Sequence, residues 1–266
     1  MNGISAVRSV LFLPASNPRA ISRARESAAD LIILDLEDAV KPDDKDSARA
    51  AAVEAAASDW SMPLAIRVNG VGTEWHSLDV DAVARSQARF VVLPRATSAH
   101  LAHEVAEATA KPLFAMIETA AGVLASAEIA SESAALIAGT NDLRADLRIP
   151  VGNDRSPILT PLQMVVLAAR AAGIAAIDGV FNNLEDVEGF AAECSNGRSL
   201  GFDGKSLIHP NQIEACNRAF SPSEEEIARA KRLIEAYGGG AERFEGQMIE
   251  RMHLEAAKRM VDRSGG

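Results

Sequence analysis

The stretch LIILDLED, Leu31 to Asp38, is a run of β-forming apolar residues that ends abruptly in three carboxylates, Asp35, Glu37 and Asp38. A buried strand that presents carboxylates at its carboxyl end is how an α/β barrel supplies a metal site or an acid–base site. The stretch therefore favours a barrel fold with its chemistry at the strand ends.

The same pattern recurs three times along the chain. LAIR ends in a cation at Arg67, LFAMIE ends in Glu118, and LIAGTND ends in Asp142. One charge after one strand usually belongs to a solvated loop. Four such strands are harder to explain that way, because a barrel brings the carboxyl ends of its strands to one mouth.

Eight strand-like runs alternate with Ala-rich amphipathic stretches, which is typical of βα units around a parallel sheet. No Gly-x-Gly-x-x-Gly follows the first run, so a closed barrel is favoured over an open dinucleotide-binding sheet. We predict an α/β fold, a TIM (β/α)8 barrel over residues 1–220. The predicted strands are Val10–Pro14, Leu31–Asp35, Leu64–Val68, Phe90–Leu93, Leu113–Ile117, Leu136–Ala138, Ala175–Val180 and, more weakly, Leu200–Phe202.

Residues 221–266 form a C-terminal extension with additional helices. The segment Ser221 to Tyr237 is expected to be a capped, charged helix, because acidic residues suit the positive end of a helix dipole. Three glycines, Gly238 to Gly240, then predict a flexible joint, and Gln247 to Asp262 predicts a last helix. A complete barrel does not need this tail, which is more often a packing or oligomer contact than a lid.

The composition bounds the function. With 266 residues, 48% of them hydrophobic, the chain can bury the core of one barrel domain. The net charge of −10 argues against nucleic acid and anionic membranes as partners, so an anionic ligand needs a local cluster of cations. Cys194 and Cys216 suggest neither a zinc site nor a disulfide framework, and the sequence has no secretion signal or membrane span, so we expect a cytoplasmic protein with reduced thiols.

The strand ends also predict the kind of chemistry. Glu118 and Asp142, on adjacent strands, suit Mg²⁺, which is often held by one or two carboxylates together with waters and substrate oxygens. Glu37 and Asp38 could orient metal-bound waters, or one of them could be a general base, while Asp38 could equally cap the next helix. Arg67 would bind a carboxylate or stabilise an enolate oxygen.

A metal, an arginine and several carboxylates, without a Ser-His or Cys-His pair, indicate enolate chemistry, in which a C–C bond next to a carbonyl is made or broken. Hydride transfer and nucleophilic acyl transfer are less well supported. Lys205 could suggest a Schiff-base aldolase, but no apolar pocket is evident around it, so this interpretation is disfavoured.

Seven ordered motifs resemble the citrate lyase beta-subunit-like proteins of the HpcH/HpaI aldolase/citrate lyase family, over nearly the whole chain. They are RSVLFLPASNP (8–18), ADLIILDLEDAVKPDDK (29–45), IRVNGVGTEW (66–75), VVLPRA (91–96), MIETAAG (116–122), AGTNDLRADL (138–147) and GFDGKSLIHPNQI (201–213).

The resemblance implies a homo-oligomeric TIM barrel, a trimer or hexamer, that uses Mg²⁺ and cleaves a CoA thioester. It implies Glu118 and Asp142 as metal ligands, Arg67 as a substrate-binding and catalytic residue, and Glu37 and Asp38 as the acidic pair. It also places Glu118, Arg19 and Arg95 at the substrate.

The chain departs from the family pattern at four places. Ala15 replaces the glycine of a Pro-Gly turn, Arg95 stands where lysine is usual, and Asn141 stands where glutamate is common. The family's Gly-Lys-Met-Val-Asp element, whose aspartate reaches a neighbouring subunit as an acid or base, becomes Gly246 to Glu250. The resemblance therefore adds a second interpretation of the extension, as a lid over a neighbouring subunit with Glu250 as a catalytic residue, and we expect a shifted substrate preference.

The predicted function is a Mg²⁺-dependent carbon–carbon lyase that cleaves a small β-hydroxyacyl-CoA of the malyl-CoA or citramalyl-CoA type into an acyl-CoA and a 2-oxo acid. Three alternatives stay open. They are the beta subunit of a citrate lyase complex acting on an acyl-carrier-protein thioester, a CoA-independent hydroxy-oxo-acid aldolase, and a non-catalytic barrel.

Overall fold

A computed structural model describes residues 7–150, 152 and 154–264. Two compact units divide the chain, one up to Asn217 and the other from Arg218 onward. Within the described residues, no helix is both long enough and apolar enough to cross a membrane.

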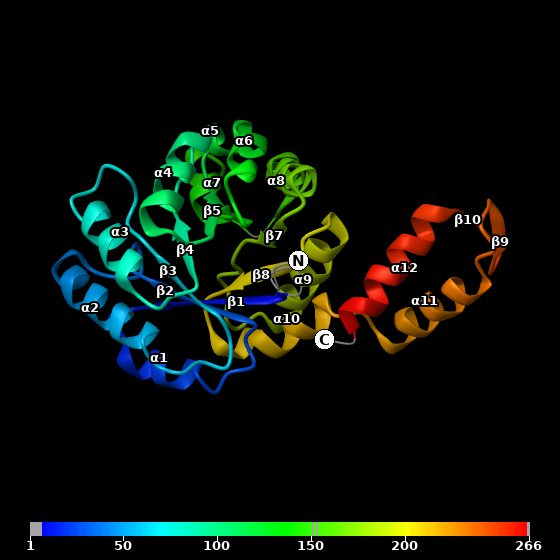
Figure 1. The fold of residues 1–266 in the computed structure, drawn as a ribbon, viewed down its shortest axis with the longest axis horizontal. Coiled ribbons are helices and arrows are strands. Elements are labelled where there is room, and N and C mark those ends of the chain that lie inside the picture. Colours follow the sequence, from blue (N-terminus) through cyan, green and yellow to red (C-terminus); the bar gives the residue numbers. More distant parts are fainter. Residues whose placement is uncertain (1–6, 151, 153, 265–266) are drawn as a thin grey trace. The chain divides into compact units, whose positions relative to one another are not determined.

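The first unit contains a closed barrel of eight parallel strands, each paired with the next in chain order and the last paired with the first (Figure 1). The predicted TIM barrel is therefore confirmed. The strands are β1 (Ser9–Pro14), β2 (Leu31–Asp35), β3 (Leu64–Arg67), β4 (Phe90–Leu93), β5 (Leu113–Ile117), β6 (Ala135–Ala138), β7 (Ala175–Asp178) and β8 (Gly204–Leu207).

Helices follow the strands around the barrel. They are α1 (Pro18–Ala24), η1 (Pro42–Asp44), α2 (Lys45–Ala56), α3 (His76–Arg85), α4 (Ala99–Thr109), α5 (Ala120–Leu124), α6 (Ser126–Ser131), α7 (Thr140–Asp146), η2 (Ser156–Ile158), α8 (Leu159–Ala172), α9 (Val187–Leu200), η3 (Pro210–Gln212) and α10 (Ile213–Phe220), which crosses the unit boundary. Several begin at side-chain caps that satisfy free backbone N–H groups, such as Ser98 for α4 and Thr119 for α5.

The barrel interior is filled by alternate apolar side chains of its strands. On β2 these are Leu31 and Ile33, and on β5 they are Phe114 and Met116. The intervening residues, such as Ile32, are also fully buried and face the helices. Burial on both faces explains why the strands read as continuous apolar runs rather than alternating ones.

The predicted eighth strand, Leu200–Phe202, is wrong. Leu200 ends α9, and Gly201 caps that helix in the left-handed conformation at a φ of 100°. The strand lies at Gly204–Leu207, where Lys205 and Ser206 make the sequence look polar although both are buried. Ion pairs of Lys205, described below, permit that burial.

The second unit holds α11 (Glu224–Ala236), the antiparallel hairpin of β9 (Glu242–Phe244) and β10 (Gln247–Ile249), and α12 (Arg251–Ser264). The capped charged helix is present as α11, where Ser223 and Glu226 form a capping box. The single helix predicted from Gln247 is wrong in its first turn, because Glu245 and Gly246 both have positive φ and turn the chain into a hairpin.

Candidate active site

Three charged side chains continue the inward-facing rows of the barrel at the carboxyl ends of the strands. Asp35 follows Leu31 and Ile33 on β2, and its Cα is paired in register with that of Arg67 on β3. Glu118 follows Phe114 and Met116 directly after β5. All three are buried, so the strand geometry alone directs them into one mouth.

Arg67 is held by an ion pair along one edge of its guanidinium group. Its Nε and Nη2 atoms donate to the two carboxylate oxygens of Asp35, both at 2.6 Å. Nη1 lies 2.8 Å from Glu37 Oε2, an ion pair without the alignment of a hydrogen bond. Burial alone would lower the pKa of Arg67, but Asp35, Glu37 and Glu118 raise it. Arg67 is therefore a fixed cation, and Nη1 is the guanidinium nitrogen that does not donate to Asp35.

Glu37 and Asp38 differ in environment although they are neighbours. Glu37 is partly buried beside Arg67, while Asp38 is exposed. Burial raises the pKa of Glu37 to about 8, and the negative charges of Asp38, Glu118 and Asp35 add to the effect, although Arg67 opposes it. A carboxylate with a pKa near neutrality can both accept and return a proton.

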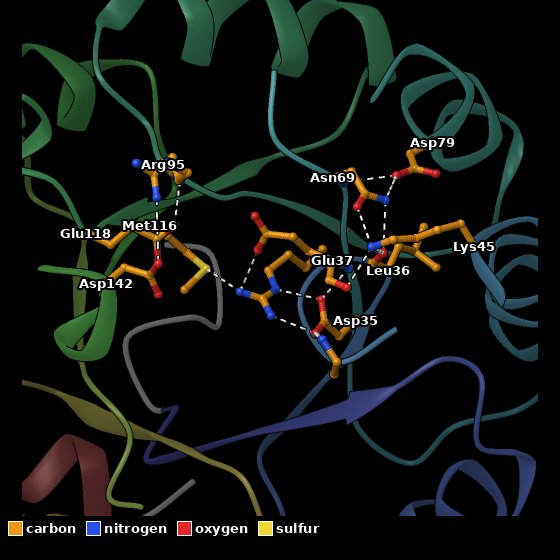
Figure 2. Close-up of polar contacts among 12 residues, drawn as sticks. Asp35, Leu36, Glu37, Lys45, Asn69, Asp79, Arg95, Met116, Glu118 and Asp142 are labelled. Carbon is orange, nitrogen blue, oxygen red and sulfur yellow. Dashed lines mark hydrogen bonds and ion pairs between the residues drawn. The ribbon is translucent and has the colours of Figure 1, made fainter. Parts of the chain in front are cut away.

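Glu118 directly after β5 and Asp142 in the first turn of α7 lie close together, and Arg95 contacts both of them (Figure 2). The backbone N–H of Arg95 donates to Glu118 Oε1 at 2.6 Å, and its Nη1 lies 3.7 Å from Asp142 Oδ1. Arg95 has a φ of 48°, a conformation that non-glycine residues rarely adopt. Burial raises the pKa of Glu118 to about 7, while the hydrogen bond from Arg95 opposes the shift.

The two carboxylates suit a hard divalent cation. Among the described residues no group of three or more His, Cys, Asp or Glu side chains is arranged to hold a metal, so a metal here would depend on the pair and on other oxygens. Mg²⁺ is commonly bound in this way, by one or two carboxylates with waters and substrate completing the octahedron. Burial raises the pKa of Glu118 despite the opposing effects of the Arg95 N–H and Arg67, and a bound cation would favour the charged form of this carboxylate.

Gly139 makes room for this carboxylate. A Cβ atom at Gly139 would lie 2.3 Å from Glu118 Oε2 and 2.4 Å from Glu118 Cβ, closer than real Cβ contacts allow. The connection between β6 and α7 therefore requires glycine for Glu118 to keep its position.

Two other predicted site residues, Arg19 and Glu250, are exposed, unlike the buried groups at the mouth. Arg19 is exposed in the first turn of α1, which follows β1. Glu250 is exposed between β10 and α12 in the second unit, where its backbone N–H donates to His253 Nδ1. The roles of these residues, like those of Arg67, Glu37, Asp38, Glu118, Arg95 and Asp142, stay predictions.

Sequence reasoning assigned no role to Asp35, although the opening motif contains it, and missed Lys45, Asn69 and Asp79 behind the mouth. Asp35 could have been found from the strand period, because it lies two residues after Ile33 on the inner face. The other three lie on helices and a loop, and only the fold brings them together.

Lys205 is fully buried but is not a free amine. Its Nζ lies 3.1 Å from Asp178 Oδ2 and 2.7 Å from Glu193 Oε1, and Arg155 pairs with the same aspartate. Burial would lower the pKa of Lys205, yet Asp178 and Glu193 raise it. A charged ammonium group cannot attack a carbonyl, so the paired Lys205 does not suit a Schiff-base mechanism, as predicted from the sequence.

A cavity of about 370 Å³ opens at the carboxyl ends of β6 and β7. Its lining includes Asn141 and Arg144 of α7, Asn182 after β7, and Glu193 of α9. Glu118 and Asp142 do not line the cavity, but Asn141 of its lining directly precedes Asp142 in the chain.

The closed parallel barrel, with a buried arginine and a carboxylate pair at its mouth, has the architecture of an α/β-barrel enzyme. The HpcH/HpaI aldolase/citrate lyase family model matches residues 8–210, and the chain belongs to this family. The family resemblance, the enzyme class and the lyase chemistry predicted from the sequence are confirmed.

Curated relatives cover almost the whole chain. A (3S)-malyl-CoA thioesterase of Cereibacter sphaeroides (strain ATCC 17025 / ATH 2.4.3) is 43% identical over 96% of this chain and 93% of the relative. A citrate lyase subunit beta of Leuconostoc mesenteroides subsp. cremoris is 36% identical over 100% of this chain and 98% of the relative.

Among solved structures, the CitE protein of Mycobacterium tuberculosis in complex with magnesium, acetoacetate and coenzyme A superposes with a TM-score of 0.87. It is 34% identical and covers 98% of this chain and 100% of that one.

Proposed function

We propose that the protein is a Mg²⁺-dependent lyase that cleaves a small β-hydroxyacyl-CoA, of the malyl-CoA or citramalyl-CoA type, into an acyl-CoA and a 2-oxo acid. The observation that carries this proposal is the convergence of the Arg67 guanidinium with the Glu118 and Asp142 carboxylates at one barrel mouth. A CoA thioester as the substrate is supported by a relative named (3S)-malyl-CoA thioesterase and by the CitE complex with magnesium and coenzyme A.

Glu118 and Asp142 would hold the metal. When bound there, Mg²⁺ would supply Lewis-acid polarisation of a substrate oxygen. Arg95 would meet the same end of the substrate, since it lies beside both carboxylates and more than half of its side chain is exposed.

Glu37 would act as the acid–base residue of the pair. It accepts the proton of the substrate β-hydroxyl, the bond between the α- and β-carbons breaks, and the hydroxyl carbon becomes the carbonyl of the 2-oxo acid. The electron pair passes to the acyl-CoA fragment as an enolate, whose oxygen is stabilised by the fixed charge of Arg67. A proton then returns to the α-carbon and completes the acyl-CoA. Glu37 is favoured over Asp38 because it touches Arg67 and has a pKa near neutrality.

The remainder of the substrate would extend away from these groups. The cavity at β6 and β7 has the volume of a typical ligand pocket. Arg19, at the start of α1, would offer a cation to the CoA phosphates from the other side of the mouth.

Hydrolysis of the thioester is a second candidate function. Four relatives that are 41–43% identical carry the name (3S)-malyl-CoA thioesterase. The same fixed cation could stabilise the oxyanion formed when water attacks the thioester carbonyl. The products differ, because hydrolysis yields free CoA and malate, whereas C–C cleavage leaves the thioester intact.

A product assay separates the two functions. Malyl-CoA and citramalyl-CoA are incubated with Mg²⁺, while free thiol and 2-oxo acid are followed in parallel, with Glu118→Ala as the control. We expect 2-oxo acid and acyl-CoA without free thiol, and we expect EDTA or Glu118→Ala to abolish both. Release of thiol without 2-oxo acid would establish the hydrolase instead, and no reaction with either ester would redirect the search to acyl-carrier-protein thioesters.

We also propose where the protein acts and how it assembles. Cys194 and Cys216 are buried and free, as expected for a cytoplasmic protein. We propose a homo-oligomer, a trimer or hexamer, with an acyl-carrier protein as an alternative thioester carrier. Two relatives are named as subunits of citrate lyase, which supports an assembly.

A further inference from the structure

A buried polar cluster lies behind the barrel mouth, next to the carboxyl ends of β2 and β3 (Figure 2). Its members are Lys45, the first residue of α2, Asn69, two residues after β3, and Asp79 of α3, which we call the Lys45 cluster. Their exposed fractions are 5%, 2% and 0%. The mechanism above uses none of the three.

The ammonium group of Lys45 donates three hydrogen bonds, to the segment that follows β2 and to the segment that follows β3. Its Nζ donates to the carbonyl oxygens of Leu36 and Glu37, both at 2.7 Å, and to Asn69 Oδ1 at 2.6 Å. An ammonium group has three donors, so every one is used within the protein. Both carbonyls that flank the Leu36–Glu37 step are thereby fixed.

Asp35 holds the same segment from the opposite side. Its Oδ1 accepts the N–H of Glu37 at 2.8 Å, while its two oxygens also bind Arg67. Glu37 thus has its N–H fixed by Asp35 and its carbonyl fixed by Lys45. The backbone from which the Glu37 side chain reaches Arg67 Nη1, 2.8 Å away, is therefore held from both sides.

The cluster continues to α3, which anchors it. Asp79 Oδ2 accepts from both the backbone N–H and the side-chain amide of Asn69, at 2.9 and 2.6 Å. Arg49 pairs with the other oxygen of Asp79 at 2.7 Å. Asn69 in turn donates to the Leu36 carbonyl at 2.9 Å.

Helix stability alone does not account for a lysine at this position. Lys45 begins α2, where the positive end of the helix dipole disfavours a cation. Burial also lowers the pKa of Lys45, against the nearby charges of Asp35, Glu37, Asp79 and Asp38. Burying a cation at this helix end therefore costs free energy. What it provides in return is a fixed backbone at Glu37.

We propose, on the basis of the function proposed above, that Lys45 is a positioning residue that sets the Glu37 carboxylate against Arg67 for proton transfer. Without its ammonium group the Leu36 and Glu37 carbonyls lose their shared donor, and the segment is free to shift. A displacement of about 1 Å at a reacting group can cost on the order of 100-fold in rate.

The test compares Lys45→Met with Arg49→Met, its matched control. Each change removes one cation from α2, and the two positions are four residues apart. Arg49 contacts the cluster only through Asp79, whereas Lys45 donates to the carbonyl oxygens of Leu36 and Glu37. We expect kcat of Lys45→Met to fall about 10- to 100-fold with KM changed by less than about three-fold. Arg49→Met should keep kcat within about three-fold even if both variants unfold at lower denaturant concentration.

Equal loss of kcat in the two variants, or none in Lys45→Met, would overturn the proposal. If Lys45→Met does not fold, Lys45→Gln keeps a donor and should show a smaller fall in kcat with KM preserved. Unchanged kcat in that variant would count against the proposal in the same way.

A crystal structure of the lysine variant gives a readout that does not depend on the reaction. We expect the Glu37 carboxylate to leave Arg67 while the Asp35–Arg67 pair stays in place. An unmoved Glu37 would overturn the positioning role, whereas an inactive wild-type protein would contradict only the proposed function.

Discussion

Arg67 remains charged at the barrel mouth because Asp35 compensates it along a full edge of the guanidinium group. Asp35 is only 1% exposed, and each of its oxygens also accepts a backbone N–H, from Glu37 or Ala39. Its carboxylate is thus satisfied by a cation and by the chain that follows the strand. Removing one partner of such a pair leaves an uncompensated buried charge.

We expect Asp35→Asn to lower the free energy of unfolding by about 3–5 kcal/mol, because Arg67 would stay buried without its counter-charge. Urea denaturation measures the change. Asp38→Asn is the control, since Asp38 is exposed and its replacement should stay within about 0.5 kcal/mol. Similar stabilities for the two variants would contradict the role given to Asp35.

Glu37 makes stability depend on pH in a defined window. Its pKa rises from 4.5 to about 8 in the folded protein, so the native state holds a proton that the unfolded chain has lost. The resulting stabilisation is complete below pH 4.5 and is lost as the pH rises toward 8. In the presence of EDTA, the unfolding free energy of the wild type should therefore fall across this window relative to Glu37→Gln.

The size of that relative change is of order a few kcal/mol, which denaturant titrations at several pH values can resolve. Parallel pH profiles for wild type and Glu37→Gln would mean that Glu37 ionises normally and is not tuned for proton transfer.

At the scale of elements, the strands and the strand-end charges could be predicted from sequence because both depend on local pattern. Apolar runs of four to six residues predict buried parallel strands, and the barrel then directs their ends. This reasoning places Arg67, Glu37 and Glu118 at the mouth from the sequence alone.

The strand β8 shows where local pattern fails. Lys205 reads as a polar residue, and only its long-range pairs with Asp178 and Glu193 make its burial possible. The Lys45 cluster was missed for the same reason, since Lys45 and Asn69 are 24 residues apart. The hairpin at Glu245 was missed because a non-glycine residue with positive φ carries no strong sequence signal.

The connection between β6 and α7 gives a prediction at this scale. Gly139→Ala would place a Cβ against the Glu118 carboxylate and displace it without changing any charge. We expect Mg²⁺ affinity, measured by calorimetry, to fall about 10- to 100-fold. Gly70→Ala is a suitable control, because its Cβ would meet Glu37 Oε1 at an ordinary 3.9 Å. Unchanged affinity in Gly139→Ala would argue against Glu118 as a ligand.

At the scale of the whole molecule, the second unit carries the predicted catalytic Glu250 on a short segment between β10 and α12. Such a tail can serve the site of its own subunit or that of a neighbour. The family resemblance implies the neighbour, and subunit mixing tests it.

We expect Glu37→Gln and Glu250→Gln each to lose most activity, and their co-expressed mixed oligomers to regain part of it, because a mixed pair of subunits can assemble one intact site. Mixed oligomers are isolated with two different affinity tags and assayed beside each parent variant. Formation of mixed oligomers without recovered activity would place Glu250 in its own subunit's site or outside catalysis.

The most direct measurement follows the protonation of the enolate. Wild-type protein is incubated with (3S)-malyl-CoA and Mg²⁺ in D₂O, and the products are analysed early by mass spectrometry. C–C cleavage at the Arg67 mouth predicts glyoxylate together with acetyl-CoA that carries one deuterium in its methyl group. Malate and free CoA, with no labelled acetyl-CoA, would contradict the lyase mechanism.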